Sequence, residues 1–383
     1  MTNCTLKNSA PKSTSVLHLP TTVGGQAWAL ANGERAIGLD AKVLALYGNY
    51  LDYPADYAYT LERKGALGRA IGHLSALARF RSGFDAYHFN YGSSIIHFLR
   101  RGILHWDLPI FDSSARKIFT YNGCDARQKD ITVQMQRKRH GDAAIAACFN
   151  PNCYAGLCNS GVVDRNRRKA IEKAARYADH IFALNPDLLQ FLPREKATFL
   201  PYAVAGFESI ALRPTPPGSG EKIRLVHAPT NRVVKGTSYI LSALKRLSDR
   251  FPGKIEIVVV EGVSHEEALK IFKTADIVVD QVLVGWYGGL AVEVMKMGIP
   301  VASYINDDHF EYVPIPMVKE NPIIRINPFD IEEKLLHFIH NREAIAELGM
   351  ASLRFVERWH DPAKLARITE AAYRGLRLPD IAN

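Results

Sequence analysis

The stretch DIVVDQVLVGWYGGLAVEVMKMGIPVASYI, residues 276–305, decides the fold. It begins with a short apolar run, passes through glycines at 285–289, and continues as an apolar helical segment that carries one carboxylate, Glu293. Gly298-Ile-Pro300 ends that segment, because glycine and proline both terminate helices, and a second apolar run follows at 300–305. Two strands that are apolar on both faces and joined by a helix are typical of a parallel sheet covered by helices.

The same alternation of short apolar runs and longer helical stretches extends over the 383 residues. It predicts strands at 15–19, 42–47, 86–90, 117–122, 180–185, 198–203, 223–228, 255–260, 276–281 and 300–305. Ser264 with Glu267, and Asp330 with Glu333, have the spacing of capping boxes at helix N-termini. The fold class is therefore α/β, with two doubly wound parallel sheets. We expect domains at 1–208 and 223–361, joined by a Pro- and Gly-rich linker at 209–222.

The composition is that of an ordinary globular protein, with 47% apolar and 23% charged residues. No apolar run approaches the roughly 18 residues that a membrane span needs, and the first residues, MTNCTLKNSAPKSTS, contain no apolar core of a signal peptide. Five cysteines in a chain of this length do not make a disulfide framework. Together these features favour a cytoplasmic location.

The charge is unevenly distributed along the chain. Residues 1–206 carry 26 Lys and Arg against 16 Asp and Glu, whereas the remainder carries 22 against 23. A basic first half favours anionic partners, although a solvated helix face has the same composition. Residues 67–83 mix apolar and basic side chains as an interfacial helix does, so we expect peripheral contact with the inner face of an anionic membrane as one option and ordinary packing as the other.

Two loops that follow predicted strands of the first half are candidates for binding. Gly24 and Gly25 come directly after the first strand, and their backbone N–H groups could approach a ligand closely; the alternative is a tight turn. Asn122 and Asp125 lie in the loop after the strand at 117–122, where the alternative is an Asx turn with a surface ion pair.

Two loops of the second half are stronger candidates. Arg232 and Lys235 lie between the strand at 223–228 and its helix, where two cations beside a helix N-terminus suit a diphosphate. Gly288 and Gly289 precede the helix that carries Glu293. A carboxylate there could bind ribose hydroxyls while the glycine amides face a phosphate; the alternative is a carboxylate that interacts only with the helix dipole.

These loops carry a family resemblance. The stretch ADIVVDQ (275–281) with GWYGGLAVEVMKMGIPVASYI (285–305) resembles the nucleotide-sugar site of the family 4 retaining glycosyltransferases, and NRVVKG (231–236) resembles that family's phosphate-binding loop. FDAYHFNYGSS (84–94), TYNGCDAR (120–127) and FVERWHDPAK (355–364) resemble further segments of the family.

The resemblance implies a GT-B fold, with a nucleotide-sugar donor on the second domain, an acceptor on the first, and a last helix at about 362–383 that crosses back onto the first domain. It implies that Arg232 and Lys235 bind the donor diphosphate, that Glu293 binds the ribose, and that Gly24 and Gly25 approach the phosphate and sugar. The resemblance further places Tyr287, Gly288, Gly289 and Leu290 at the donor and Asn122 and Asp125 among the catalytic residues.

The activity so implied is retaining, metal-independent transfer of a hexose to a glycan or lipid-linked acceptor, in cell-envelope or capsular polysaccharide synthesis, with no cofactor and no nucleic-acid partner. Absence of an Asp-x-Asp pattern agrees with metal independence. Gly285 stands where the family has a first glutamate, and Asn122 where it often has histidine. The alternatives are a catalytically silent nucleotide-sugar or glycan-binding protein and a sugar-nucleotide epimerase on the same fold.

Four cysteines form a separate group. Cys148, Cys153 and Cys158 follow one another at five-residue intervals, and Cys124 is a candidate fourth ligand. A structural zinc ion at these residues is a minor alternative to four free thiols, because the spacing is not that of a standard zinc knuckle.

Overall fold

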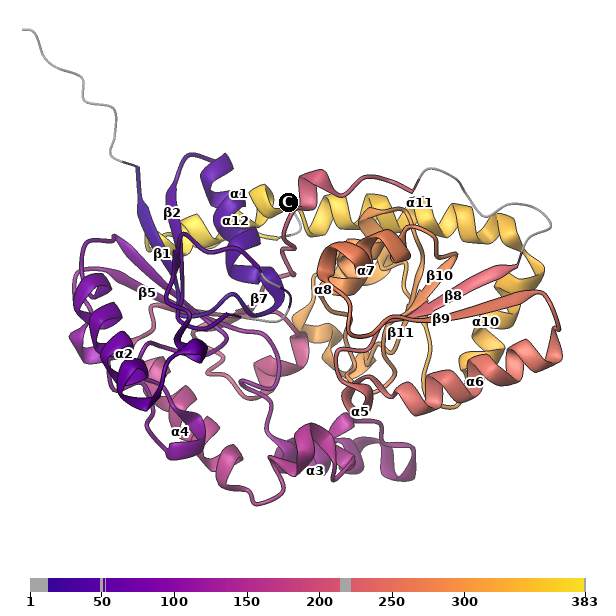
Figure 1. The fold of residues 1–383 in the computed structure, drawn as a ribbon, viewed down its shortest axis with the longest axis horizontal. Helices are drawn as coiled ribbons and strands as arrows, with labels where there is room; N and C mark the ends of the chain where they lie inside the picture. Colours follow the sequence, from indigo (N-terminus) through magenta and orange to yellow (C-terminus); the bar gives the residue numbers. More distant parts are fainter. Residues whose placement is uncertain (1–12, 49–50, 52, 214–221, 382–383) are drawn as a thin grey trace, which may run out of the picture.

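A computed structural model describes residues 13–48, 51, 53–213 and 222–381, which form two α/β domains side by side (Figure 1). Within this part of the chain the first domain holds a seven-stranded parallel sheet of order β3-β2-β1-β4-β5-β6-β7. Its strands are β1 (Ser15–Leu19), β2 (Asp40–Ala45), β3 (Tyr57–Ala58), β4 (Ala86–Asn90), β5 (Arg116–Tyr121), β6 (His180–Ala183) and β7 (Ala197–Phe199).

The second domain holds a five-stranded parallel sheet of order β12-β11-β10-β8-β9. Its strands are β8 (Ile223–His227), β9 (Ile255–Val259), β10 (Ile277–Val279), β11 (Val301–Ser303) and β12 (Ile324–Arg325). All ten predicted strands are present; four have the predicted length and six are one to three residues shorter. The short edge strands β3 and β12 were not predicted.

Helices connect the strands. Those of the first domain are α1 (Gln26–Ala36), α2 (Ala66–Phe80), α3 (Lys129–His140) and α4 (Val162–Tyr177). Those that follow are α5 (Arg232–Lys235), α6 (Thr237–Arg250), α7 (His265–Phe272), α8 (Gly289–Lys296), α9 (Ile315–Glu320), α10 (Ile331–His340), α11 (Arg342–Trp359) and α12 (Pro362–Tyr373). Among the described residues no helix is long and apolar enough to cross a membrane.

One of the two predicted capping boxes has its N-cap hydrogen bond. The Ser264 hydroxyl accepts a hydrogen bond from the backbone N–H of Glu267 at the start of α7. The prediction for Asp330 is wrong, because its carboxylate accepts from the backbone and side-chain N–H groups of Asn327 instead. Of the predicted linker, residues 214–221 lie outside the described part of the chain, and Arg213 before them donates to the Ala275 carbonyl of the second domain.

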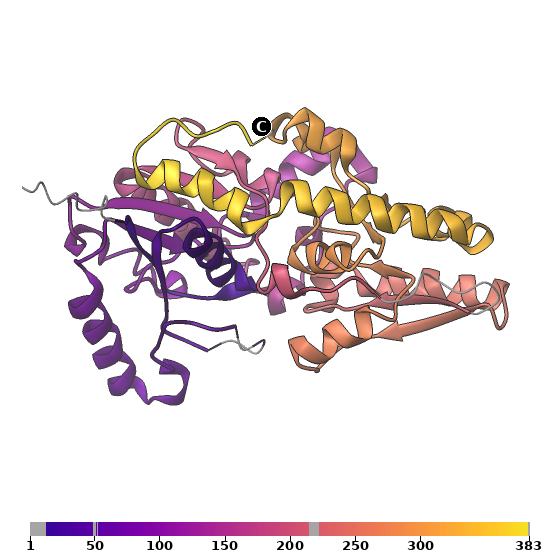
Figure 2. The ribbon, with the colours of Figure 1, turned by 90° about the horizontal axis from the view of Figure 1, so that it is seen from above.

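The last two helices join the domains from one side. Figure 2 shows α11 along the second domain and α12 continuing over the first, where α12 packs on α1. His360, at the junction, contacts the Tyr202 carbonyl at 2.8 Å and the Tyr287 hydroxyl at 3.0 Å, one from each side of the junction. The helix at the predicted crossing is therefore present, and it ends at Tyr373.

A buried polar network holds α12 on the first domain. The Glu34 carboxylate on α1 is fully buried and accepts from His18 at 2.7 Å, from Thr369 at 2.9 Å and from Tyr373 at 2.6 Å. His88 completes the network through the Tyr373 hydroxyl and Thr120, and burial lowers its pKa. His18, Glu34 and His88 are the one group among the described residues whose ligand atoms lie close enough together to hold a metal ion. Because these atoms already make hydrogen bonds within the protein, we interpret the group as a structural network.

Gly33 makes the contact between α1 and α12 close. A Cβ at this position would lie 2.1 Å from the carbonyl oxygen of Pro362. We therefore expect Gly33→Ala to force α12 away from α1 and to lower stability by about 1–3 kcal/mol, the usual cost of overpacking. Thermal unfolding measures this loss.

The matched control is Gly68→Ala, which also lies inside a helix of the first domain and faces only the flexible side chain of Lys64 at 3.3 Å. Alanine favours a helix over glycine by about 1 kcal/mol, so this variant should be neutral or slightly stabilised. Equal effects of the two substitutions would contradict the close-packing argument.

Candidate functional site

Both sheets have a topological switch point, where ligands of open α/β sheets bind at the carboxyl ends of the strands. In the first sheet it lies between β1 and β4, and in the second between β8 and β10. The loops that leave these strands contain Gly24 and Gly25, Tyr91 to Ser94, Arg232 and Lys235, and the glycines before α8. Three of the four candidate loops therefore follow the strands at the switch points, and the fourth, with Asn122 and Asp125, follows β5 beside β4.

The glycine loop of the first domain reaches the second domain through two rings. Gly24 and Gly25 have φ of 68° and 69°, which favours glycine, and a Cβ on Gly25 would lie 2.7 Å from the ring of Tyr53. That ring lies 5.5 Å from the ring of His265, at the start of α7. The loop is therefore part of the interdomain surface.

Glu293 lies on the other side of His265. Its carboxylate is nearly buried and accepts a hydrogen bond from His265 Nε2 at 2.9 Å. This hydrogen bond raises the pKa of His265 and outweighs burial, which lowers it. A chain of contacts from Gly25 through Tyr53 and His265 to Glu293 thus joins two loops that are far apart in the sequence.

The residues before Glu293 differ in exposure. A Cβ on Gly288, the N-cap of α8, would meet nothing within 4 Å, and Gly289 and Leu290 are partly exposed in the first turn. Tyr287, predicted at the donor, has a fully buried side chain that stacks on Trp286 and contacts His360. Its side chain is therefore packed at the α11–α12 junction and is not accessible to a ligand.

Arg232 and Lys235 both have carboxylate partners. Arg232 is paired with Glu261, Nε to Oε1 at 2.9 Å, and both side chains are substantially exposed. Lys235 Nζ is paired with Asp280, whose side chain is fully buried and whose second oxygen has no hydrogen-bond partner. The guanidinium of Arg232 can exchange partners at little cost, whereas moving Lys235 would leave a buried carboxylate uncompensated.

Hydrogen bonds within the loop after β5 hold its conformation. The Asp125 carboxylate accepts from the backbone N–H of Asn122 at 2.9 Å and of Gly123 at 2.5 Å. Burial raises the pKa of Asp125, and these hydrogen bonds oppose the rise. The Asn122 side-chain oxygen is buried without a partner, while its backbone carbonyl accepts from Asn185 and Tyr202. Both hydrogen bonds to the Asp125 carboxylate come from residues that precede Asp125, whereas the side chain of an Asx turn accepts from the backbone N–H two residues on, so the Asx-turn interpretation is wrong. The predicted surface ion pair is wrong as well, because Arg127 pairs with Asp187 and both side chains are largely buried.

Residues 129–161 of the first domain, which we call the insert, extend to the second domain. The backbone N–H of Ala147 donates to the Leu283 carbonyl at 3.1 Å, and Arg139 and His140 pair with Asp308. Figure 1 shows α3, within this insert, beside α5. Only a cavity of about 50 Å³ is left where the insert meets Gly285, which is far below the roughly 300–1,000 Å³ of typical ligand sites.

The four candidate zinc ligands line one cavity of about 20 Å³ beneath the insert: Cys124, Cys148, Cys153 and Cys158. No three of their sulfurs lie within 4.8 Å of one another, although all four residues are described. Burial raises the pKa of the Cys148 thiol to about 12, and Arg127 and Arg167 contact the sulfurs of Cys124 and Cys158. In this arrangement the cysteines are separate thiols and not a formed tetrahedral site.

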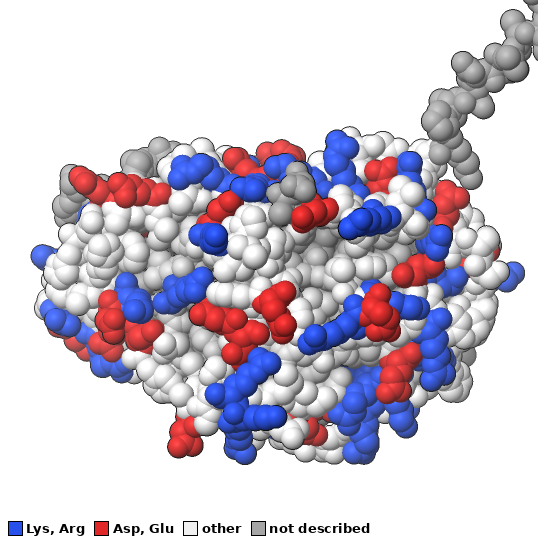
Figure 3. Space-filling model, turned by 180° about the vertical axis from the view of Figure 1, so that it is seen from behind, with Lys and Arg blue, Asp and Glu red and all other residues white. Residues whose placement is uncertain are grey.

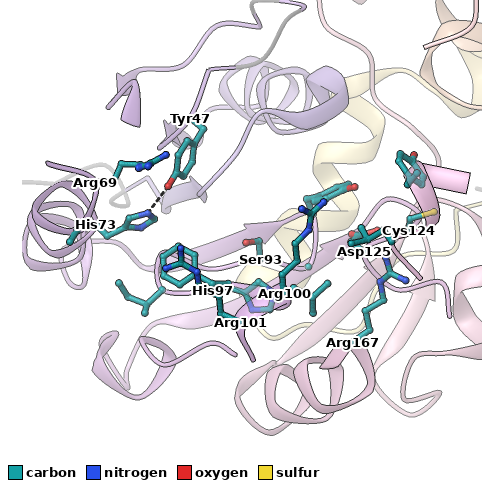
Figure 4. A pocket seen from close by; sticks show the side chains of 18 of the residues that line it. Tyr47, Arg69, His73, Ser93, His97, Arg100, Arg101, Cys124, Asp125 and Arg167 are labelled. Carbon is teal, nitrogen blue, oxygen red and sulfur yellow. Dashed lines mark hydrogen bonds between the residues drawn. The ribbon is translucent and has the colours of Figure 1, made fainter. Parts of the chain in front are cut away.

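A larger cavity lies within the first domain. It has a volume of about 830 Å³ and extends from α2 to the loop at 124–125. Figure 4 shows Tyr47, Arg69 and His73 at one end and Cys124, Asp125 and Arg167 at the other. Cys124 also lines the small cavity at Gly285, so the larger cavity ends beside the contact between the insert and the second domain.

Solved structures resemble the whole chain at low sequence identity. Sucrose-phosphate synthase from Thermosynechococcus elongatus superposes with a TM-score of 0.58 at 13% identity, over 94% of this chain and 98% of that one. The catalytic domain of starch synthase IV from Arabidopsis thaliana, bound to ADP and acarbose, gives 0.58 at 10% identity, over 95% and 99%. A protein described as a UDP-N-acetylglucosamine 2-epimerase from Listeria monocytogenes gives 0.52 at 11% identity, over 97% and 99%.

The predicted GT-B fold is confirmed by these likenesses and by the two parallel sheets. No protein-family model and no curated protein matches the chain.

Several residues of the site were not predicted from the sequence. Tyr53 and His265 connect the domains, Glu261 and Asp280 pair with the two predicted cations, and Arg69, Arg100 and Arg101 line the large cavity. Glu261 and Asp280 do stand at the ends of predicted strands, a signal that could have found them.

The pairing of His265 with Glu293 predicts pH-dependent stability. Because the pKa of His265 is raised, its contribution is complete below the ordinary histidine value of about 6.5 and is lost as the pH rises through the raised pKa. We expect His265→Ala to cost about 1–2 kcal/mol at pH 6 and clearly less at pH 9, by thermal unfolding.

Ser264→Ala serves as the control, since it removes an uncharged hydrogen bond at the start of the same helix, α7. Because the serine hydroxyl does not titrate in this range, the effect of this substitution should not change between the two pH values. A loss on His265→Ala that is the same at pH 6 and pH 9 would contradict the charged pairing.

Proposed function

We propose that this protein is a retaining glycosyltransferase that transfers a hexose from a nucleotide sugar without a metal ion or cofactor. The donor is held mainly by the second domain and the acceptor, a glycan or a lipid-linked saccharide, by the first. The setting that follows from the sequence resemblance is cell-envelope or capsular polysaccharide synthesis at the cytoplasmic face of a membrane. The resemblance to the family 4 enzymes supports the retaining outcome.

One observation carries the proposal. On a GT-B fold, the Gly24-Gly25 loop of the first domain and the Glu293 helix of the second meet through Tyr53 and His265. The two loops lie far apart in the sequence, and the family resemblance places both at the same ligand. Their N-terminal helix turns supply backbone N–H groups suited to a diphosphate, and Glu293 supplies an acceptor for ribose hydroxyls.

The chemistry is electrostatic. Departure of a nucleoside diphosphate places negative charge on the phosphate and positive charge on the sugar. Arg232 exchanges its exposed partner Glu261 for the diphosphate, while Lys235, compensated by Asp280, adds a more distant cation. A front-face reaction that retains configuration needs no protein nucleophile, so the hydrogen-bonded state of Asp125 does not conflict with the mechanism.

Donor binding requires the insert to move. Leu283 and Gly285 would stand near the transferred sugar, and Ala147 now covers them. Separation of the insert from the second domain breaks the backbone hydrogen bond of Ala147 and the surface pairs of Asp308, which are individually weak.

The insert leaves little space at Gly285, which favours a second candidate, a nucleotide-sugar-binding protein that does not transfer the sugar. The family's first glutamate is absent there, and the cavity is small. Such a protein would bind a nucleotide sugar without releasing nucleotide. An epimerase would convert the free nucleotide sugar without any acceptor, which proton NMR of the same mixture detects.

The test is a thermal-shift and hydrolysis screen of UDP-, GDP- and ADP-sugars. We expect one nucleotide family to stabilise the protein, with slow nucleotide release. Arg232→Ala should weaken that binding about tenfold or more, because it removes a charge-assisted hydrogen bond to the diphosphate.

Arg246→Ala is the matched control: Arg246 is similarly exposed, lies in the same domain and is also paired with a glutamate, Glu332. It should leave binding unchanged. If no nucleotide sugar shifts the melting temperature, the donor site is wrong; binding without release of nucleotide or change of the sugar supports the silent candidate.

A further inference from the structure

The large cavity of the first domain is strongly basic. Four arginines line it, Arg69, Arg100, Arg101 and Arg167, against one carboxylate, Asp125. Asp125 is already held by the backbone N–H groups of its own loop, and Arg167 is held by Asp164. Arg69, Arg100 and Arg101 have no carboxylate within salt-bridge distance in the described part of the chain. Three guanidinium groups are thus available to an anion.

This basicity is local. On the face shown in Figure 3, basic and acidic side chains are interspersed over both domains. In Figure 4, by contrast, Arg100 and Arg101 lie together beside His97, and Arg69 lies across the cavity on α2. Burial lowers the pKa of His97 to about 4, so the charge of the cavity comes from the arginines.

Beside the cavity, α2 has an exposed apolar face. Leu67, Ile71 and Leu74 are 76%, 58% and 62% exposed, and their spacing places them on one face of α2. The opposite face of the helix, with Ala76, Leu77 and Phe80, packs into the core. Leu74 and Ala70 line the cavity, so the apolar face continues directly from the arginines. Exposed large aliphatic side chains grouped in this way mark a binding surface.

The arrangement of these side chains indicates the chemical class of the ligand. The apolar face of α2 adjoins a cavity with three arginines that have no carboxylate partner in the described part of the chain. The other end of the cavity, at Cys124 and Asp125, adjoins the contact between the insert and the second domain. A soluble phosphorylated sugar would account for the arginines but not for the aliphatic face. A neutral glycan would account for neither.

We propose that this cavity binds an acceptor whose saccharide is linked through phosphate to a lipid. Arg69, Arg100 and Arg101 bind the phosphate, the hydrocarbon chain lies against Leu67, Ile71 and Leu74, and the saccharide points toward Cys124 and Asp125. The inference rests on the proposed transfer function, of which it names the acceptor. Guanidinium groups suit phosphate oxygens because of their charge and planar donor geometry.

Isothermal titration of the full chain with farnesyl monophosphate, below its micelle concentration, tests the assignment. Farnesol, sodium phosphate and glucose 1-phosphate are the comparison ligands. We expect farnesyl phosphate to bind at least about tenfold more tightly than each of the three, since only it engages both the arginines and the apolar face.

Two variants separate the contributions. Arg100→Ala with Arg101→Ala should weaken farnesyl phosphate at least about tenfold, whereas Arg246→Ala with Arg250→Ala, which removes two exposed charges from α6, should have no effect. Leu67→Gln, Ile71→Gln and Leu74→Gln together should reduce farnesyl phosphate to the affinity of glucose 1-phosphate. Because these residues are exposed, the melting temperature should be unchanged.

Equal binding of farnesyl phosphate and inorganic phosphate would overturn the proposal in favour of a soluble acceptor. Equal losses in the two arginine pairs, or no binding at all, would also overturn it. A nucleotide-sugar thermal shift on the same preparation keeps the two proposals apart. If that shift persists while farnesyl phosphate fails to bind, the acceptor assignment is wrong and the donor assignment stands.

Discussion

The buried carboxylate of Glu34 is the constraint on which the arrangement of the domains depends. A charge removed from water must be fully hydrogen-bonded, and two of the three donors to Glu34, Thr369 and Tyr373, come from α12. Together with the close contact at Gly33 they fix α12 on α1. Because α11 packs on α8, the same crossover ties α8 of the second domain to α1 of the first. These are the two helices whose N-terminal turns face the proposed donor.

Much of the fold could be predicted from the sequence, because its determinants are local. The strands are apolar on both faces, and the Ser264 cap belongs to a pattern of four consecutive residues. The edge strands β3 and β12 are two residues long and too short for a pattern. The Asp330 cap failed because Asn327, outside the expected motif, competes for the carboxylate.

The candidate site was less predictable, because its contacts join residues far apart in the chain. The sequence indicates that Arg232 and Lys235 are cations in a strand-end loop. It does not indicate that Arg232 pairs with an exposed glutamate and Lys235 with a buried aspartate. Burial decides their difference: Arg232 is free to exchange partners and Lys235 is not. The resemblance of the glycine-rich stretch predicts that Tyr287 binds the donor. In the structure its side chain is buried and contacts His360. The contact of the insert with Leu283 has no local signature.

The most direct test is amide hydrogen exchange of the full chain, with and without the nucleotide sugar that stabilises it most. Binding at the interdomain site predicts slower exchange in peptides covering residues 23–30 and 285–296 and faster exchange in the insert as it leaves Leu283. Protection confined to the first-domain cavity, with 285–296 unchanged, would contradict a donor site between the two domains.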